Sequence, residues 1–140
     1  MRYFIDTNII LFLFNSRDEL ERNVLEILND AENEFVISSE SVREILMLVK
    51  NGKINFKKLR SYVGIMSVLE EHGVDVHYVD RNSLKKLSDL EPAPSHSDPA
   101  DLMIIAHAMT ENLPIISSDT KFIFYKKQGL KLIHNSRSKR

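Results

Sequence analysis

Four acidic residues far apart in the chain each lie where alternating strands and helices would bring them to one edge of a sheet: Asp6, Glu44, Asp101 and Asp119. Asp6 directly follows the short apolar segment 3–5, and Asp119 follows the segment 114–118. Residues just past the carboxyl ends of parallel strands face the crevice in which open α/β sheets bind ligands. Carboxylates crowded there repel one another unless a cation neutralises them. The pattern therefore predicts a site for a hard divalent cation.

Each acid also has a purely structural explanation. Asp98 and Asp101 fall at the start of a predicted helix, where capping and the helix dipole favour acids by themselves. Asp119 lies in the sequence Ser-Ser-Asp-Thr, which suits an Asx turn. Asp6 is the hardest to explain in this way, because a carboxylate after a buried strand is unfavourable unless it is paired or metal-bound.

Glu44 competes with Glu40, one helical turn earlier, because one of the two could simply be solvated. We favour Glu44, since its neighbours at 42, 45 and 46 are apolar core positions that hold its backbone close to the sheet. No two histidines have a metal-ligand spacing, so we interpret His96 as a loop residue and His107 as a helix-surface residue.

Apolar periodicity predicts the elements that must position these acids. We expect strands at 3–6, 35–38, 74–79, 115–117 and 130–133, and helices at 18–29, 40–49 and 56–71. A further helix begins at 98–101 and is apolar nearly all round through residue 109, so it should be buried. Such alternation predicts a parallel sheet with helices on both faces.

Size and charge set the wider limits. The 140 residues suit a single domain at 1–134, followed by a basic, frayed C-terminal tail at 135–140. The formal net charge is -1, so the overall charge gives no sign of a nucleic-acid binder. Local charge does: from Lys121 onward there are seven basic residues and no acid. Such runs are usually solvated surface, but beside an anionic metal site they become candidate phosphate contacts.

The chain contains no cysteine, which excludes disulfides and thiolate metal sites. The amino terminus lacks the apolar stretch and cleavage pattern of a signal peptide. No segment approaches the roughly 20 apolar residues that cross a bilayer. We expect a soluble cytoplasmic protein with no membrane partner.

Four short motifs, in this order, resemble those of PIN domains, and most closely the VapC-like ribonuclease toxins of toxin–antitoxin modules. They are Asp-Thr-Asn at 6–8, Ile-Ser-Ser at 37–39 leading to Glu44, Asp-Pro-Ala-Asp at 98–101, and Asn-Leu-Pro at 112–114 leading to Ser-Ser-Asp at 117–119. Each motif is weak alone, but the ordered set is fairly specific. The resemblance runs from residue 2 to about residue 133.

The resemblance implies a three-layer α/β/α sandwich with a mainly parallel sheet and an acidic pocket that binds Mg²⁺ or Mn²⁺ to cut RNA. The family's acidic positions match Asp6, Glu44, Asp101 and Asp119, with Asp98 as an additional acid of some members. Thr7, Asn8 and Ser117 match supporting polar positions. A cognate antitoxin protein and a homodimer are also implied. Many relatives carry Phe and Arg around the third acid, where this chain has Ala100 and Leu102, so a local salt bridge or phosphate contact is in doubt.

We therefore predict a metal-dependent endoribonuclease, the toxin of a type II toxin–antitoxin pair. Asp6, Asp101 and Asp119 would hold the cation, with Glu44 acting directly or through water. The candidate RNA contacts are basic side chains expected around the rim of the pocket: Arg43, Lys50, Lys53 and Lys121.

Two alternatives stay open. A phosphatase could use Asp6 as its nucleophile, but that class usually needs a second acid at the position of Asn8. A non-catalytic PIN-like module could bind RNA, or a protein through the apolar segment 9–14, but such a module has no need to gather mutually repelling acids.

Overall fold

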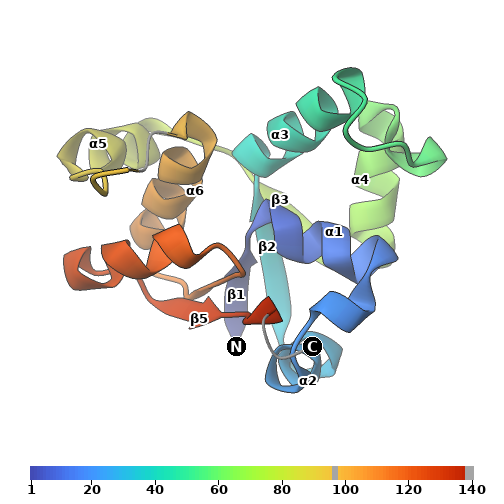
Figure 1. Cartoon of the computed structure of the whole chain (residues 1–140), viewed down its shortest axis with the longest axis horizontal. Coiled ribbons are helices and arrows are strands. Elements are labelled where there is room, and N and C mark those ends of the chain that lie inside the picture. Colours follow the sequence, from blue (N-terminus) through green and yellow to red (C-terminus); the bar gives the residue numbers. More distant parts are fainter. Residues whose placement is uncertain (96–97, 138–140) are drawn as a thin grey trace.

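The structure is a computed structural model that describes residues 1–95 and 98–137. The interpretation of His96 as a loop residue therefore lies outside the described residues. The strands are β1 (Arg2–Ile5), β2 (Glu34–Ser38), β3 (Val74–His77), β4 (Ile115–Ser117) and β5 (Leu132–His134). The α-helices are α1 (Thr7–Asn15), α2 (Arg22–Asn29), α3 (Ser39–Lys50), α4 (Tyr62–Glu71), α5 (Arg81–Asp89) and α6 (Pro99–Thr110), with 3₁₀ segments η1 (Arg17–Glu19), η2 (Lys57–Leu59) and η3 (Thr120–Gln128) (Figure 1).

The five strands form one sheet in the order β3-β2-β1-β4-β5, and every pair is parallel. The chain first adds strands on one side of β1 and then returns to add β4 on its other side. The strand order therefore reverses at β1 and β4, and the crevice beyond such a reversal is where open α/β sheets bind ligands. Asp6 follows β1 at this point, and its backbone N–H donates to the carbonyl of Ile116 on β4 at 2.9 Å.

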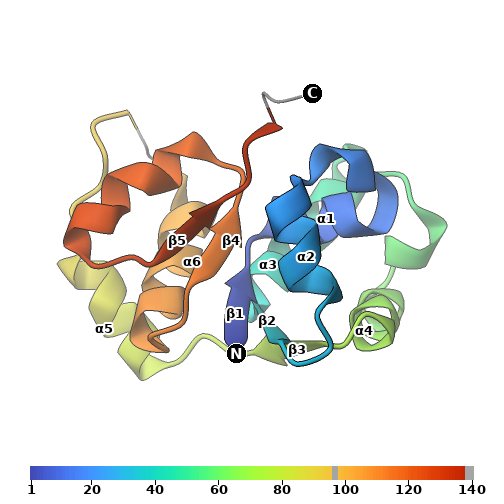
Figure 2. The same cartoon turned by 90° about the horizontal axis from the view of Figure 1, so that it is seen from below.

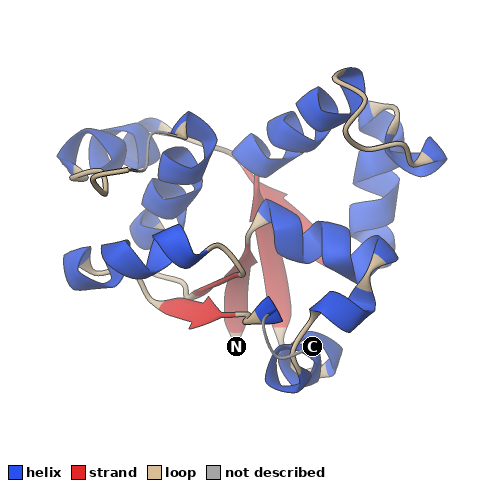
Figure 3. Ribbon diagram, viewed as in Figure 1, coloured by secondary structure: helices blue, strands red, loops and turns tan. Residues whose placement is uncertain are grey.

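Helices cover both faces of the sheet, because successive side chains of a strand point to opposite faces. Figure 2 shows α5 and α6 on one side of β1, and α1, α3 and α4 on the other. In Figure 3 the strands lie between these two layers of helices. The prediction of a three-layer sandwich with a parallel sheet is confirmed.

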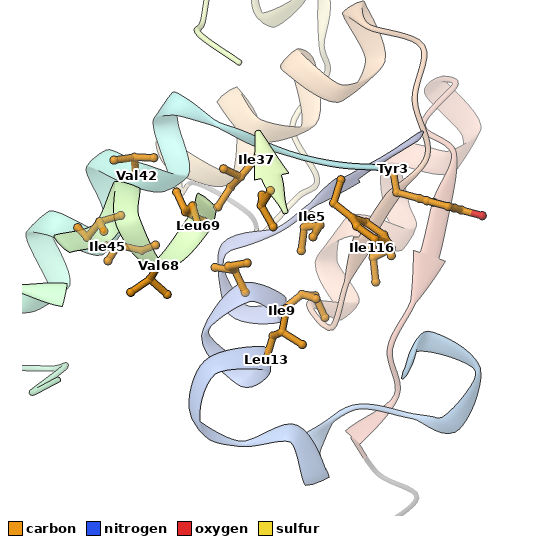
Figure 4. Close-up of a cluster of buried hydrophobic side chains, with 14 of the residues drawn as sticks. Tyr3, Ile5, Ile9, Leu13, Ile37, Val42, Ile45, Val68, Leu69 and Ile116 are labelled. Atoms are coloured by element: carbon orange, nitrogen blue, oxygen red, sulfur yellow. The ribbon is translucent and has the colours of Figure 1, made fainter. Parts of the chain in front are cut away.

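Each face has its own hydrophobic core. Ile5, Ile37 and Ile116 pack against side chains of α1, α3 and α4, as Figure 4 shows for Ile9 and Ile45. On the opposite face, Phe4, Val36 and Ile115 pack against α6 and η3. The neighbours Phe4 and Ile5 are both fully buried, one in each core, so β1 is covered on both faces. A strand buried in this way holds the residue that follows it, Asp6, in a fixed place.

All five predicted strands are present, but two predicted helices are interrupted. The expected helix 18–29 is the 3₁₀ segment η1 followed by α2, and the expected helix 56–71 is η2 followed by α4. The second break arises where Ser61 caps α4, its hydroxyl accepting a hydrogen bond from the N–H of Gly64 at 3.0 Å. A Cβ on Gly64 would lie 2.1 Å from the carbonyl oxygen of Lys58, so only glycine lets η2 fold back so closely.

Residues 138–140 of the predicted tail 135–140 lie outside the described residues, and residues 135–137 make long-range contacts. Asn135 is fully buried, and its backbone N–H donates to Ser117 at 2.8 Å. Its amide side chain accepts from the N–H of Glu21 at 2.7 Å and donates to the carbonyl of Glu19 at 3.0 Å. Arg137 donates to the Glu19 carboxylate at 2.7 Å. Basic composition suggested a tail, whereas these long-range contacts hold the segment.

Among the described residues, every helix is too short or too polar to cross a membrane.

Candidate functional site

Asp6 is the most deeply buried of the predicted acidic residues. Its carboxylate is 3 % exposed and accepts hydrogen bonds from the backbone N–H of Thr7 at 2.8 Å and from the hydroxyl of Ser117 at 2.7 Å. The pKa of Asp6 is raised from 3.8 to about 7; burial is the largest cause, the nearby charges of Asp101 and Glu44 act in the same direction, and the hydrogen bonds from Ser117 and Thr7 oppose the rise. The fold therefore disfavours the ionised form of Asp6 unless a positive charge is close.

Glu44 reaches the same place from α3. It is half-buried, and its Oε1 accepts a hydrogen bond from the hydroxyl of Thr7 at 2.6 Å. Burial raises the pKa of Glu44, the bond from Thr7 lowers it, and the charges of Asp98 and Glu40 raise it. Glu40 instead pairs with Arg43 on the same helix. Of the two glutamates weighed in the sequence, Glu44 is the one that faces the acids.

Asp98 and Asp101 come from the first turn of α6. The Oδ1 atom of Asp98 caps the helix, accepting from the N–H groups of Ala100 at 2.9 Å and Asp101 at 3.3 Å. Asp98 therefore has the capping role that the sequence allowed. Carboxylate oxygens of Glu44, Asp98 and Asp101 nevertheless all lie within 4.8 Å of one another. Capping and membership of the acidic group coexist in Asp98.

Asp119 lies beyond β4 and caps η3, its Oδ1 accepting from the N–H of Lys121 at 2.9 Å. Its own N–H donates to the hydroxyl of Ser117 at 3.1 Å. Ser117 thus accepts from the backbone of Asp119 while its hydroxyl proton goes to Asp6. This serine couples the ends of the two strands at which the strand order reverses.

These acids line one pocket of about 240 Å³, which we name the acidic pocket and define by Asp6, Glu44, Asp98, Asp101 and Asp119. Thr7, Asn8, Leu11 and Leu48 complete its lining. The Oδ1 atom of Asn8 is buried and accepts no hydrogen bond from the described part of the chain. All the candidate ligand atoms are oxygens, as hard cations such as Mg²⁺ and Mn²⁺ require. The residues present therefore fit a divalent cation.

The four predicted RNA contacts lie outside the lining of the acidic pocket. Arg43 is on α3 and is ion-paired with Glu40. Lys50 ends α3, Lys53 lies in the following turn, and Lys121 is in η3. All four side chains are exposed, as phosphate contacts must be. Lys121 is the one joined directly to the pocket, through its backbone bond to Asp119.

Ala100 and Leu102, the residues that depart from the usual motif around Asp101, both lie against the interior of the protein. Ala100 is buried at 7 % exposure, and Leu102 packs against the core on the α6 face of the sheet. A partly buried leucine, Leu102, thus occupies the position at which many relatives carry an arginine.

The interpretation of His107 as a helix-surface residue is wrong. His107 is 1 % exposed, and its Nδ1 lies 2.8 Å from the hydroxyl of Ser38. The signal was available in the sequence, because a residue inside a helix that is apolar nearly all round must itself be buried. Its partners, Ser38 and Glu111, could not be found in this way.

Comparison with known families decides the classification. The model of the PIN domain family matches residues 3–128, which is nearly the whole chain. The chain belongs to the PIN domain family. The five acids of the acidic pocket thus lie at the carboxyl edge of the sheet of a PIN domain. No curated protein matches it closely enough to add a relative of known activity.

Solved structures agree on the fold of this PIN domain. A chain of VapBC2 from Rickettsia felis, bound to a promoter DNA fragment, is 23% identical with a TM-score of 0.70, and the match covers 97% of this chain and 100% of that one. VapBC-1 from nontypeable Haemophilus influenzae is 22% identical, with a TM-score of 0.65 and coverage of 96% and 98%. VapBC-5 from Mycobacterium tuberculosis, a member of a family of toxin-antitoxin systems, is 16% identical, with a TM-score of 0.61 and coverage of 96% and 97%.

Proposed function

We propose that this PIN domain is a metal-dependent endoribonuclease that uses Mg²⁺ or Mn²⁺ and serves as the toxin of a toxin–antitoxin pair. The observation that carries the proposal is the acidic pocket itself. Five carboxyl groups from four separate parts of the chain converge there, and one of them, Asp6, is buried with its pKa raised to about 7. Gathering these charges is unfavourable unless a cation binds among them.

The carboxylates of Glu44, Asp98 and Asp101, with Asp6 and Asp119, would hold the cation. When bound, a divalent cation stabilises the charge that develops on a phosphate and makes water a better nucleophile. Thr7 fixes the carboxylate of Glu44 through its hydroxyl and that of Asp6 through its backbone N–H. Ser117 holds the second oxygen of Asp6. These bonds orient the ligands before a cation arrives, which lowers the cost of assembling the site.

RNA would approach the acidic pocket over exposed basic side chains. The phosphate backbone would be repelled by the acids alone, so Arg43, Lys50, Lys53 and Lys121 would supply the attraction. Lys121 has the best position, since its residue adjoins Asp119. We propose that the substrate is cytoplasmic RNA.

An antitoxin would inhibit by placing a basic or polar side chain in the acidic pocket, where it would compete with the cation. The similar folds of chains from VapBC structures support such a partner. The apolar segment 9–14 is a poorer docking surface than its sequence suggested, because Ile9, Ile10 and Leu13 are buried in the core. This burial also weakens the alternative of a non-catalytic module that binds through that segment.

Co-expression with the adjacent gene, followed by pull-down, tests the toxin assignment. Recovery of a stable complex is expected. A chain that is harmless to its host and captures nothing would contradict the assignment. Homodimerisation stays a prediction from the resemblance, and sedimentation velocity tests it.

The nuclease proposal is tested by cleavage of a labelled RNA by the purified protein. Activity should require Mg²⁺ or Mn²⁺, disappear in EDTA and return when the cation is restored. Calorimetry with Mn²⁺ on the wild type and on Asp6→Asn separates the alternatives. A non-catalytic module would bind without cleaving, and a phosphatase would form a phosphoenzyme that Asp6→Asn abolishes. Cleavage that persists in EDTA, with contaminating nuclease excluded, would overturn the proposal.

A further inference from the structure

A second buried polar group lies on the α6 face of the sheet, away from the acidic pocket. His107 of α6 places its Nδ1 2.8 Å from the hydroxyl of Ser38, which is fully buried. Ser38 is the N-cap of α3, and its Oγ accepts from the N–H of Glu40 at 3.0 Å. His107 therefore contacts the residue that starts α3. Through this contact α6 is joined to the beginning of the helix that carries Glu44.

The surrounding groups assign the proton of His107. Ser38 already accepts from Glu40, so its hydroxyl proton is available to the Nδ1 atom of His107. The ring proton is then on Nε2, which lies 3.2 Å from a carboxylate oxygen of Glu111 in a poorly aligned contact. The other tautomer would turn a lone pair toward that carboxylate and leave the Ser38 proton without an acceptor. Burial lowers the pKa of His107, although Glu111 raises it, so the ring is neutral near pH 7.

The network continues outward from Glu111. The second carboxylate oxygen of Glu111 lies 2.6 Å from the Nδ1 atom of His77, which ends β3. The Nε2 atom of His77 accepts from the guanidinium of Arg2 at 3.2 Å, so Nδ1 carries the proton that goes to Glu111. We name Ser38, His107, Glu111 and His77 the histidine network. Each of its contacts then pairs a donor with an acceptor.

The histidine network joins the two helices that carry most of the acids. α3 supplies Glu44, and α6 supplies Asp98 and Asp101, and their oxygens lie within 4.8 Å of one another. Their mutual repulsion pushes the beginnings of α3 and α6 apart when no cation is bound. The bond between His107 and Ser38 opposes that separation, and both of its partners are buried and uncharged. Water therefore cannot readily replace it.

We propose that His107 is a positioning residue that holds α3 against α6 and thereby sets the spacing of Glu44 from Asp98 and Asp101. The proposal rests on the proposed function only in taking the acidic pocket as the cation site. Its action is indirect, since His107 touches Ser38 and Glu111 and none of the five acids. Groups that hydrogen-bond the metal ligands themselves typically change metal affinity by roughly 10- to 100-fold when they are removed, and His107 acts one contact further from the ligands, so its effect should fall at the lower end of that range.

The test compares three variants by calorimetric titration of the metal-free protein with Mn²⁺. His107→Leu removes both polar contacts and should weaken binding about tenfold, the lower end of the range for outer-shell partners. His107→Asn can still meet the Ser38 hydroxyl and should recover part of the loss. His77→Asn is the matched control, because it alters the network but spares the bond between His107 and Ser38, and it should bind like the wild type. Each titration is run well below the melting temperature of the variant.

A merely structural role would lower the melting temperature of His107→Leu and leave its Mn²⁺ affinity unchanged, and that result would overturn the proposal. Hydrogen exchange of the α3 amides without metal supplies an independent measurement. Exchange should be faster in His107→Leu and unchanged in His77→Asn. Should the wild type bind no Mn²⁺, the proposed function fails, and the exchange data alone decide whether His107 holds α3. Equal hydrogen exchange in the wild type, His107→Leu and His77→Asn would show that His107 does not hold α3.

Discussion

The acidic pocket and the histidine network are both polar groups at the carboxyl edge of the sheet, yet they are built differently: acids of the pocket follow β1 and β4, whereas Ser38 and His77 end β2 and β3. In the histidine network three hydrogen bonds each pair a donor with an acceptor, and the Nε2 atom of His107 faces a carboxylate oxygen of Glu111 without a well-aligned hydrogen bond. In the acidic pocket five carboxyl groups converge, and the hydroxyls of Thr7 and Ser117 donate to Glu44 and Asp6. Among the described residues, the buried Oδ1 atom of Asn8 has no hydrogen-bond donor. The hydrogen bonds of the histidine network stabilise the fold, whereas the converging acceptor oxygens of the acidic pocket favour binding of a cation.

Burial acts on both groups in the same direction, toward the neutral form, with opposite consequences. It lowers the pKa of His107, and the neutral ring is the form that its hydrogen bonds require. It raises the pKa of Asp6 to about 7, and the neutral form is the one that a metal ligand cannot use. Only the acidic pocket therefore gains from binding a cation.

The largest expected effect is on the pH dependence of stability without metal. Asp6 takes up a proton in the folded state between its unfolded pKa of 3.8 and its folded pKa of about 7. The folded state then binds more protons, so the free energy of unfolding should fall as pH rises through this window, by on the order of 4 kcal/mol. Glu44, whose pKa is also raised, adds to the fall.

Urea denaturation in EDTA from pH 4 to 8 measures this dependence. Asp6→Asn should flatten the profile and be more stable than the wild type above pH 7, and Mn²⁺ should restore stability to the wild type at high pH. A wild-type protein that gains stability steadily from pH 4 to 7 would show that Asp6 is ionised at little cost.

The next effect is catalytic. Asp6→Asn should lower the single-turnover rate of RNA cleavage by roughly 10² or more, because it removes a ligand charge that stabilises the transition state. The control is Asp89→Asn, the same change at an exposed residue of α5. Rates are measured at saturating enzyme with Mg²⁺ or Mn²⁺. Equal rates for Asp6→Asn and the wild type would return Asp6 to a structural role.

Disrupting the histidine network should lower the free energy of unfolding, whereas Asp6→Asn should raise it in the absence of metal. Glu111→Ala leaves the ring N–H groups of His77 and His107 without their acceptor, which should cost about 1–3 kcal/mol. Glu111→Gln keeps one acceptor and should cost less. Urea denaturation at pH 7.5 without metal should therefore rank Asp6→Asn above the wild type and Glu111→Ala below it. Should Glu111→Ala prove neutral, the donors and acceptors of the network are not balanced as described.

The smallest effect is expected at the rim. Lys121→Ala should weaken RNA binding in a salt-dependent way and reduce the slope of log affinity against log salt by about one, with little change in the single-turnover rate. Lys85→Ala, an exposed lysine of α5, is the matched control. Fluorescence anisotropy between low and moderate salt measures both slopes. Identical slopes would place the phosphate path elsewhere.

The sheet was predictable because it depends on local patterns. Each strand is a short apolar segment, and the acids that follow β1 and β4 are visible as polar residues after buried ones. The break between η2 and α4 near Ser61 was not predictable, because it depends on how closely Gly64 approaches the backbone of Lys58. The apolar periodicity of the sequence continues across the break and does not indicate where the helix is interrupted.

Contacts between distant residues account for the other differences. His107 and Ser38 are 69 positions apart, and Asn135 meets Glu21 across 114 positions. Polar residues in a basic C-terminal segment look solvated until the partner is known. For Asp98 the sequence set capping against metal binding as alternatives, although one carboxyl group serves as a cap and also lies within the acidic group.

The pairing of β4 with β1 has a consequence for biosynthesis. Asp6 is synthesised more than a hundred residues before its partner Ser117, from which it accepts a hydrogen bond, and before the last acid of the pocket, Asp119. Asn135, later still, ties its backbone to Ser117. A nascent chain that stops before Ser117 lacks β4, the hydroxyl that holds Asp6 and the fifth carboxylate. The acidic pocket can therefore form only after Asp119 has been synthesised, and a product that stops before this residue cannot contain the complete pocket.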